Sequence, residues 1–132
     1  GWGVGAGATA IQSHLNRTIS FDAAALAWDF DSWIPDAVVL LIGPNDEVTG
    51  MASEGRRELL SAPSVNGEVF IQKYLELLRL IATFYARAET KPVLISVCGG
   101  SINGLDPCDD IVTAHAQFNS TQSDFIASLV SI

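Results

Sequence analysis

The chain has 132 residues, of which 48% are hydrophobic, and its formal net charge at pH 7 is −8. This hydrophobic fraction is typical of a packed globular chain, and the length leaves room for one domain at most. The acidic excess argues against a nucleic-acid-binding protein, because few cations are present to neutralise phosphates. No apolar run approaches the roughly 20 residues that a membrane-spanning helix needs, so we expect no such helix.

The chain begins with Gly1 rather than Met, and its single methionine is Met51. We therefore interpret it as a piece of a longer protein, and the lack of a signal sequence carries no information. Residues 1–9 are too rich in glycine for regular structure. Gly5-x-Gly7-x-x-Ala10 fits a loose dinucleotide-binding pattern, although no strand precedes it. A flavodoxin-like nucleotide binder is accordingly one alternative interpretation.

Residues 10–34 show neither a helical nor a strand period, but they carry an aromatic cluster. Its members are Trp28, Phe30 and Trp33. Large aromatic side chains usually pack in protein cores. We therefore interpret the cluster as packing for the loop before the first strand, with the rim of a pocket as the alternative.

Residues 37–42 are an unbroken apolar run and predict a strand that is buried on both faces, as in a parallel sheet covered by helices. The run ends abruptly at Gly43-Pro44-Asn45-Asp46. Polar groups at the carboxyl end of a parallel strand lie where open α/β sheets bind ligands. An ordinary turn is the alternative, since these residue types are the usual turn formers.

Three further elements follow. Residues 67–87 place apolar side chains at helical spacing and predict an amphipathic helix with one face in the core. Residues 92–98 predict a second buried strand. A helix is expected over residues 107–117, because proline suits a first helical position. For residues 125–132 we favour a strand over a helix.

Cys98 and Cys108 are the two cysteines of the chain. One ends a predicted strand and the other opens a predicted helix. Two thiols alone make a poor metal site, and we expect no metal. Free buried thiols and a disulfide that closes the intervening loop both remain open. A disulfide would indicate an oxidising compartment.

Gly43-x-Asn45-Asp46 after an apolar strand resembles the Gly-x-Asn-Asp block of the SGNH hydrolases, also called GDSL-type esterases. Other segments in the same order resemble the branch known as carbohydrate esterase family 2. They are residues 16–18 (Asn-Arg-Thr), 28–30 (Trp-Asp-Phe), 33–36 (Trp-Ile-Pro-Asp), Phe70-x-x-x-Tyr74 and 98–100 (Cys-Gly-Gly). The similarity covers about residues 1–112, and Pro44 stands where the family usually has Thr or Ser.

The resemblance implies a flavodoxin-like, three-layer α/β/α fold with a parallel sheet, of which residues 1–132 form a single partial domain. It also implies a serine carboxylic ester hydrolase that removes acyl groups, above all acetyl groups, from carbohydrates through an acyl-enzyme. No metal or cofactor takes part in that reaction. The substrate would be a glycan or a small-molecule ester, and the protein would be extracellular or in the secretory pathway.

The resemblance further assigns site residues. The side-chain amide of Asn45 and the backbone N–H of Gly1 would form the oxyanion hole, with Gly3 as the second choice for the backbone donor. Candidate substrate-binding residues are Trp2, Trp28, Trp33 and Asp46. The family's Gly-Asp-Ser and Asp-x-x-His blocks do not occur in the sequence. We therefore expect the nucleophile, on a strand N-terminal to this chain, and the C-terminal base to lie outside it.

Local residues do not replace the two blocks. Ser96 and Ser101 lack the sequence of a nucleophile elbow, and we interpret His14 and His115 as surface or capping residues. Without the nucleophile's strand, the apolar strand over residues 37–42 would have an open edge. A non-catalytic module on a hydrolase-like fold, which binds a glycan or peptide through Trp28 and Trp33, is the alternative function.

Overall fold

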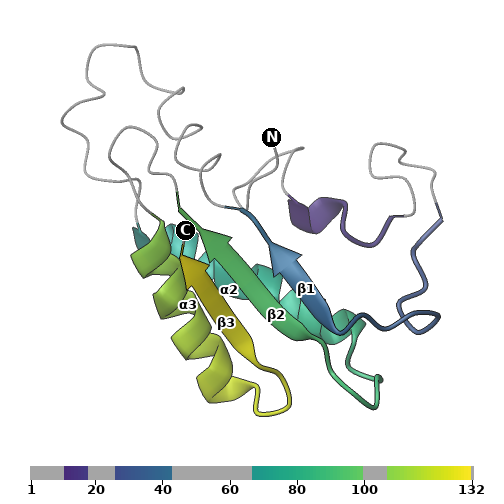
Figure 1. The fold of residues 1–132 in the computed structure, drawn as a ribbon. Helices are drawn as coiled ribbons and strands as arrows, with labels where there is room; N and C mark the ends of the chain where they lie inside the picture. Colours follow the sequence, from purple (N-terminus) through teal and green to yellow (C-terminus); the bar gives the residue numbers. More distant parts are fainter. Residues whose placement is uncertain (1–10, 18–25, 43–66, 100–106, 132) are drawn as a thin grey trace, which may run out of the picture.

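The computed structural model describes residues 11–17, 26–42, 67–99 and 107–131. The elements in these ranges, in chain order, are η1 (Ile11–Ser13), β1 (Ala37–Leu40), α2 (Gly67–Phe84), β2 (Val93–Cys98), α3 (Cys108–Thr121) and β3 (Ala127–Ser131). The three strands form a parallel sheet in the order β1-β2-β3 (Figure 1). The α/β class with a parallel sheet, as predicted from the sequence, is confirmed.

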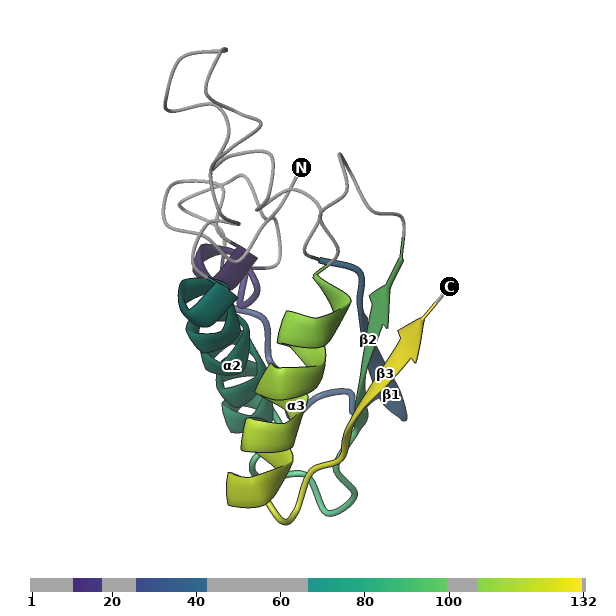
Figure 2. The same cartoon turned by 90° about the vertical axis from the view of Figure 1, so that its left-hand side faces the viewer.

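Helices α2 and α3 lie next to each other on one face of the sheet (Figure 2). Each helix connects two neighbouring parallel strands, and the strand order advances in one direction. Since such connections are right-handed, both helices must cross on the same face. The described residues therefore form two layers, the sheet and one layer of helices.

Strand β1 shows the consequence of this arrangement. Its side chains alternate between the two faces, so Leu40 and Ile42 are buried against the helices. Val39 and Leu41 on the other face are 62% and 68% exposed. The expectation that residues 37–42 are buried on both faces is therefore wrong for the described structure, because both described helices cover the same face.

The core lies between the sheet and the two helices. Its largest fully buried side chains are Tyr74, Leu77 and Leu78 from α2, Leu94 and Ser96 from β2, Ile111 and Phe118 from α3, and Pro92. The apolar face predicted for the helix after residue 67 is thus confirmed as core. Burying one such leucine stabilises the fold by about 2 kcal/mol relative to leaving it exposed.

The two helices also meet at their amino ends. A Cβ atom at Gly67, the first residue of α2, would lie 3.0 Å from both carboxylate oxygens of Asp110. A larger residue at this position would push the Asp110 side chain away. Glycine therefore permits the close approach between the first turns of α2 and α3.

Helix α3 ends later than predicted, at Thr121 rather than at residue 117. The side-chain amide of Asn119 explains the extension. Its Nδ2 donates to the carbonyl of Ala127 over 2.9 Å, and its Oδ1 accepts from the N–H of Ala127 over 3.0 Å. This pair fixes the start of β3 against the last turn of α3, and the strand favoured for residues 125–132 is confirmed.

Neither of the described helices is long and apolar enough to cross a membrane.

Candidate functional site

The carboxyl ends of β1 and β2 lie side by side at one edge of the sheet (Figure 1). The pairing of Leu40 with Ser96 fixes the register there, and Cys98 then ends β2. Ligands of open α/β sheets bind at this edge, in the crevice beyond the strand ends. We therefore take the carboxyl edge of the sheet as the candidate site.

Five of the predicted site residues lie outside the described residues: Gly1, Trp2, Gly3, Asn45 and Asp46. The last residue described before Asn45 is Ile42, which continues from β1 toward the carboxyl edge. The oxyanion hole assigned to Asn45 and Gly1 accordingly stays a prediction.

Trp28 and Trp33 are described, and both side chains are exposed, at 42% and 64% respectively. The backbone N–H of Trp28 donates to the carbonyl of Asn16 over 2.7 Å, which holds Trp28 against the segment that follows η1. The interpretation of the aromatic cluster as packing is therefore wrong for these two tryptophans. Their role in binding substrate stays a prediction.

Phe30, the third aromatic residue of the cluster, does pack. Its ring stacks on Phe84 with centroids 4.2 Å apart and meets the ring of Tyr85 edge-on. Because α2 runs back between two parallel strands, its carboxyl end, where these rings lie, is at the amino edge of the sheet. Trp33 leads into the start of β1 at that same edge. The structure therefore places Trp33 at the edge opposite to the candidate site.

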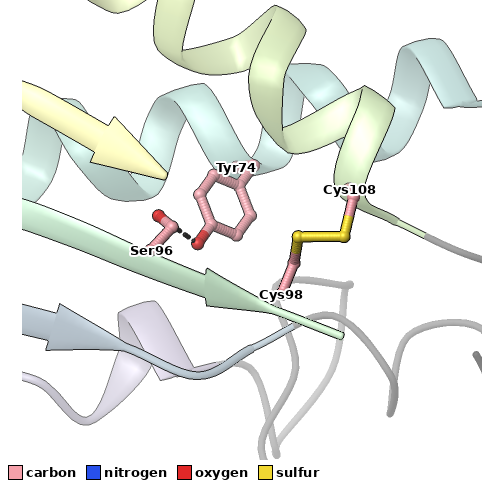
Figure 3. Close-up of a disulfide and its surroundings, with 4 residues drawn as sticks. All are labelled: Tyr74, Ser96, Cys98 and Cys108. Carbon is pink, nitrogen blue, oxygen red and sulfur yellow. Dashed lines mark hydrogen bonds between the residues drawn. A yellow bond between two sulfur atoms is a disulfide. The ribbon is translucent and has the colours of Figure 1, made fainter. Parts of the chain in front are cut away.

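A disulfide joins Cys98 to Cys108 at the carboxyl edge, with the two Cα atoms 5.5 Å apart (Figure 3). It ties the last residue of β2 to the first residue of α3. Gly99 follows with a φ of 154°, a conformation that residues with side chains rarely adopt. The question that the sequence left open, free thiols or a bridge, is answered by the bridge.

A buried polar network lies close to the disulfide. It includes Ser96, which is two residues before Cys98 on β2. The hydroxyl of Tyr74 donates to Ser96 Oγ over 2.7 Å (Figure 3). Ser96 Oγ is also 2.7 Å from Nε2 of His115. The network joins α2, β2 and α3 through one residue of each. Tyr74 and Ser96 are fully buried and His115 is 5% exposed, so the expectation of a surface or capping histidine is wrong.

The position of His115 follows from the helical period of α3. It lies four residues after Ile111 and three before Phe118, both fully buried, and so shares their face. This spacing is a signal in the sequence that would have placed His115 in the core. The imidazole tolerates that place because Ser96 hydrogen-bonds to it.

The distance between Ser96 and His115 is that of a nucleophile and its base. The surroundings are different. Ser96 lies within a strand, is fully buried, and has no path for a substrate to its Oγ. Nδ1 of His115 has no hydrogen-bond partner among the described residues, so none of them supplies the carboxylate that orients a catalytic imidazole. The Ser96–His115 pair therefore stabilises the core and is not arranged to attack an ester.

Burial sets the charge of this network. Burial lowers the pKa of His115 from 6.5. It raises the pKa of Tyr74 to about 12, although the hydrogen bond to Ser96 acts in the opposite direction. Both side chains are therefore neutral near pH 7. In the first turn of α3, burial and then the charge of Asp109 raise the pKa of Asp110.

Across the described ranges, no group of three or more His, Cys, Asp or Glu side chains is placed to hold a metal ion.

No family model matches the sequence, and no curated protein matches it. Solved structures do match. One is the acetyl xylan esterase Est2A from the rumen bacterium Butyrivibrio proteoclasticus, at 16% identity and a TM-score of 0.74 over 100% of this chain and 40% of that chain. Another is a family two carbohydrate esterase from Clostridium thermocellum in complex with cellohexaose, at 19% identity and a TM-score of 0.67 over 100% of this chain and 38% of that chain.

A third match is a carbohydrate esterase whose active site is described as having divergent catalytic and non-catalytic binding functions. Its identity is 17% and its TM-score 0.67, over 98% of this chain and 41% of that chain. At these identities the matches establish a shared fold. The present chain spans about 40% of the length of the esterases that it matches.

Proposed function

We propose that this chain is part of a serine carboxylic ester hydrolase of the SGNH type, which removes acetyl or related acyl groups from carbohydrates. The observation that carries the proposal is that β1 runs toward the carboxyl edge of a parallel sheet whose backbone matches three carbohydrate esterases. In the sequence, the Gly-x-Asn-Asp segment follows this strand. The fold and the ordered motifs both support the proposal.

In the proposed reaction a serine hydroxyl attacks the ester carbonyl while a histidine takes its proton. The tetrahedral intermediate then releases the sugar alcohol, and water hydrolyses the acyl-enzyme. The serine and the histidine come from parts of the protein outside these 132 residues. This chain supplies the oxyanion donors, the Asn45 amide and the N–H of Gly1 or, as second choice, Gly3. Each donor contributes about 3 kcal/mol in the transition state.

Trp2, Trp28 and Asp46 are the proposed contacts to the carbohydrate at this site. Trp33 was assigned with them, and its position at the amino edge makes it the weakest of the four. We further propose that the protein works outside the cell or in the secretory pathway. The Cys98–Cys108 disulfide supports this location, because such bonds persist in oxidising compartments.

A second candidate is a module that binds glycans without catalysis. The exposed rings of Trp28 and Trp33 favour it, since aromatic faces suit the apolar faces of sugars. Among the matching structures, one holds cellohexaose and another combines catalytic with non-catalytic binding functions.

The test is the substitution Asn45→Ala in the full-length protein that contains this chain. We expect the turnover of an aryl acetate to fall by about a hundred- to a thousandfold, with folding little changed, because one oxyanion donor is lost. Gln72→Ala is the matched control, since it removes an exposed side-chain amide on α2 that belongs to none of the motifs. Near-normal turnover by the Asn45 variant would remove Asn45 from the mechanism.

A serine-directed phosphonate separates the two candidates. An esterase is inactivated by it, whereas a binding module has no turnover with p-nitrophenyl acetate and retains cellohexaose. The 132-residue chain alone should be inactive, because neither the nucleophile nor its base is recognisable in it. Saturable, phosphonate-sensitive turnover by the chain alone would place the nucleophile within it, with Ser96 and Ser101 as the first residues to replace.

A further inference from the structure

The Tyr74–Ser96–His115 network holds the two helices to the central strand through neutral hydrogen bonds. Tyr74 comes from the middle of α2, Ser96 from β2 and His115 from α3. The distance from the Tyr74 hydroxyl to Ser96 Oγ and the distance from Ser96 Oγ to His115 Nε2 are both 2.7 Å, and all three side chains are buried. Breaking either bond would leave a polar group in the core without a partner, which destabilises the folded state.

The network needs no charge on the imidazole. Tyr74 donates to Ser96 Oγ, so the serine has one proton and one lone pair left for Nε2 of His115. Either neutral tautomer of the ring satisfies the Ser96–His115 bond. A second proton on the ring would make both nitrogens donors. Nδ1 has no partner among the described residues in any of these states, so the added cost of the second proton is the buried positive charge.

No charge on the packed elements compensates such a proton. The side chain of α2 that contacts the ring is the neutral Tyr74. Strands β2 (VLISVC) and β3 (ASLVS) contain no ionisable side chain apart from the bridged Cys98. The charged residues of α2 that lie closest to Tyr74 in the sequence, Lys73 and Glu76, pair with each other at the surface.

On α3 itself, the acidic residues Asp109 and Asp110 lie in the first turn, five or more residues before His115. The carboxylate of Asp110 lies instead against Gly67 at the start of α2. The imidazolium would therefore be an unpaired buried charge, which proteins avoid.

We propose that the Tyr74–Ser96–His115 network is an acid-sensitive connection between β2 and the two helices, and that it breaks when His115 takes up a proton. The proposal concerns the folding equilibrium of this chain, and it stands or falls independently of the proposed esterase activity. The disulfide holds only the first residue of α3 to β2. Acid is therefore expected to release the part of α3 that follows Cys108.

The direction of the pH dependence follows from proton uptake. The unfolded chain binds a proton at His115 near pH 6.5, whereas burial holds the pKa of the folded state below that value. Between the two values the unfolded state binds more protons, so stability falls as the pH falls. The contribution is fully present above pH 6.5. Below it, the folding equilibrium constant drops by up to about tenfold per pH unit until the folded-state pKa is reached.

The experiment compares urea unfolding of the 132-residue chain, followed by circular dichroism, between pH 7.5 and 5, at a protein concentration where sedimentation velocity shows the monomer. His115→Gln places a neutral amide near the position of Nε2 and cannot titrate. Over that pH range we expect the folding equilibrium constant to fall at least severalfold more in the wild type than in this variant. His14→Gln, which replaces the only other histidine, is the matched control and should keep the acid loss of the wild type.

Equal acid dependence in the wild type and His115→Gln would overturn the proposal. Should the variant not fold, the ring proton resonances of His115 in the folded wild type decide the question. Protonation of His115 in the folded state below pH 6.5, accompanied by faster amide exchange along α3, supports the proposal. Protonation at or above pH 6.5 overturns it.

Discussion

Ser96 is a hydroxyl on a strand face that is otherwise apolar. Its neighbours toward the helices are Leu94 and the bridged Cys98, and all three are buried. An isolated hydroxyl in such a place costs free energy, and here the bonds to Tyr74 and His115 offset that cost. The residue is therefore better explained by the packing of α2 and α3 than by ester chemistry.

Replacement of Ser96 by Ala tests this view at the scale of one residue. The variant keeps the strand but leaves the Tyr74 hydroxyl and Nε2 of His115 without their shared partner. We expect a loss of about 1–3 kcal/mol in the free energy of unfolding, measured by urea denaturation. Ser128→Ala is the control, because Ser128 is exposed on β3 and should change the stability by less than about 0.5 kcal/mol. A Ser96 variant as stable as the control would contradict a structural role for the network.

At the scale of elements, β2 and α3 are joined twice. The disulfide joins Cys98 at the end of the strand to Cys108 at the start of the helix. The second tie is the hydrogen bond between Ser96, two residues before Cys98, and His115, seven residues after Cys108. Seven residues are two helical turns, so both ties lie on one face of α3. A covalent and a hydrogen-bonded tie together fix how the helix lies on the sheet.

Removal of the disulfide should cost stability through the unfolded state. The bridged cysteines are 10 residues apart, and the chain-entropy estimate for so short a loop is about 3 kcal/mol. The variant with Cys98→Ser and Cys108→Ser should therefore unfold at lower urea concentration than the wild type, as should the wild type under a reducing agent. Mass spectrometry of non-reduced peptides supplies the direct check. Two alkylatable thiols in protein prepared under oxidising conditions would contradict the bridge.

At the scale of the whole molecule, both described helices lie on one face of the sheet (Figure 2). In the described part of the chain, the other face carries exposed apolar side chains. Val39 and Leu41 of the β1 segment and Val130 of β3 are exposed on it. Strand β1 is also an edge strand of the sheet that the described residues form. Apolar faces and open edges of this kind pair with other chains.

The 132-residue chain by itself should consequently self-associate. Sedimentation velocity at increasing concentration is expected to show species larger than a monomer. The double variant Val39→Thr, Leu41→Thr should shift the distribution toward the monomer, because it makes the open face polar. Val112→Thr is the control, since Val112 is exposed on α3, away from that face, and should have no effect. A monomer at every concentration would show that the open face does not drive association.

Local patterns predicted most of the described fold. The apolar runs predicted β1 and β2, and the apolar period predicted α2, because these states follow from side chains only a few residues apart. Boundaries were less accurate. Helix α3 continues to Thr121 because Asn119 pairs with Ala127, a contact to the next element that no local pattern contains. The Gly-x-Asn-Asp segment, and its place after an apolar strand, were likewise recognised from the sequence.

Other features depended on the tertiary structure. The sequence left the bridge of Cys98 to Cys108 open, misassigned His115, and did not predict the position of Trp33 at the amino edge. The physical reason is shared. The sequence by itself determined which segments are strands and helices, since those states follow from neighbours within a turn or a pleat. Only the fold decided which side chains meet, because Tyr74, Ser96 and His115 are 22 and 19 residues apart in sequence and reach hydrogen-bond distance only when α2 and α3 pack on the same face of β2.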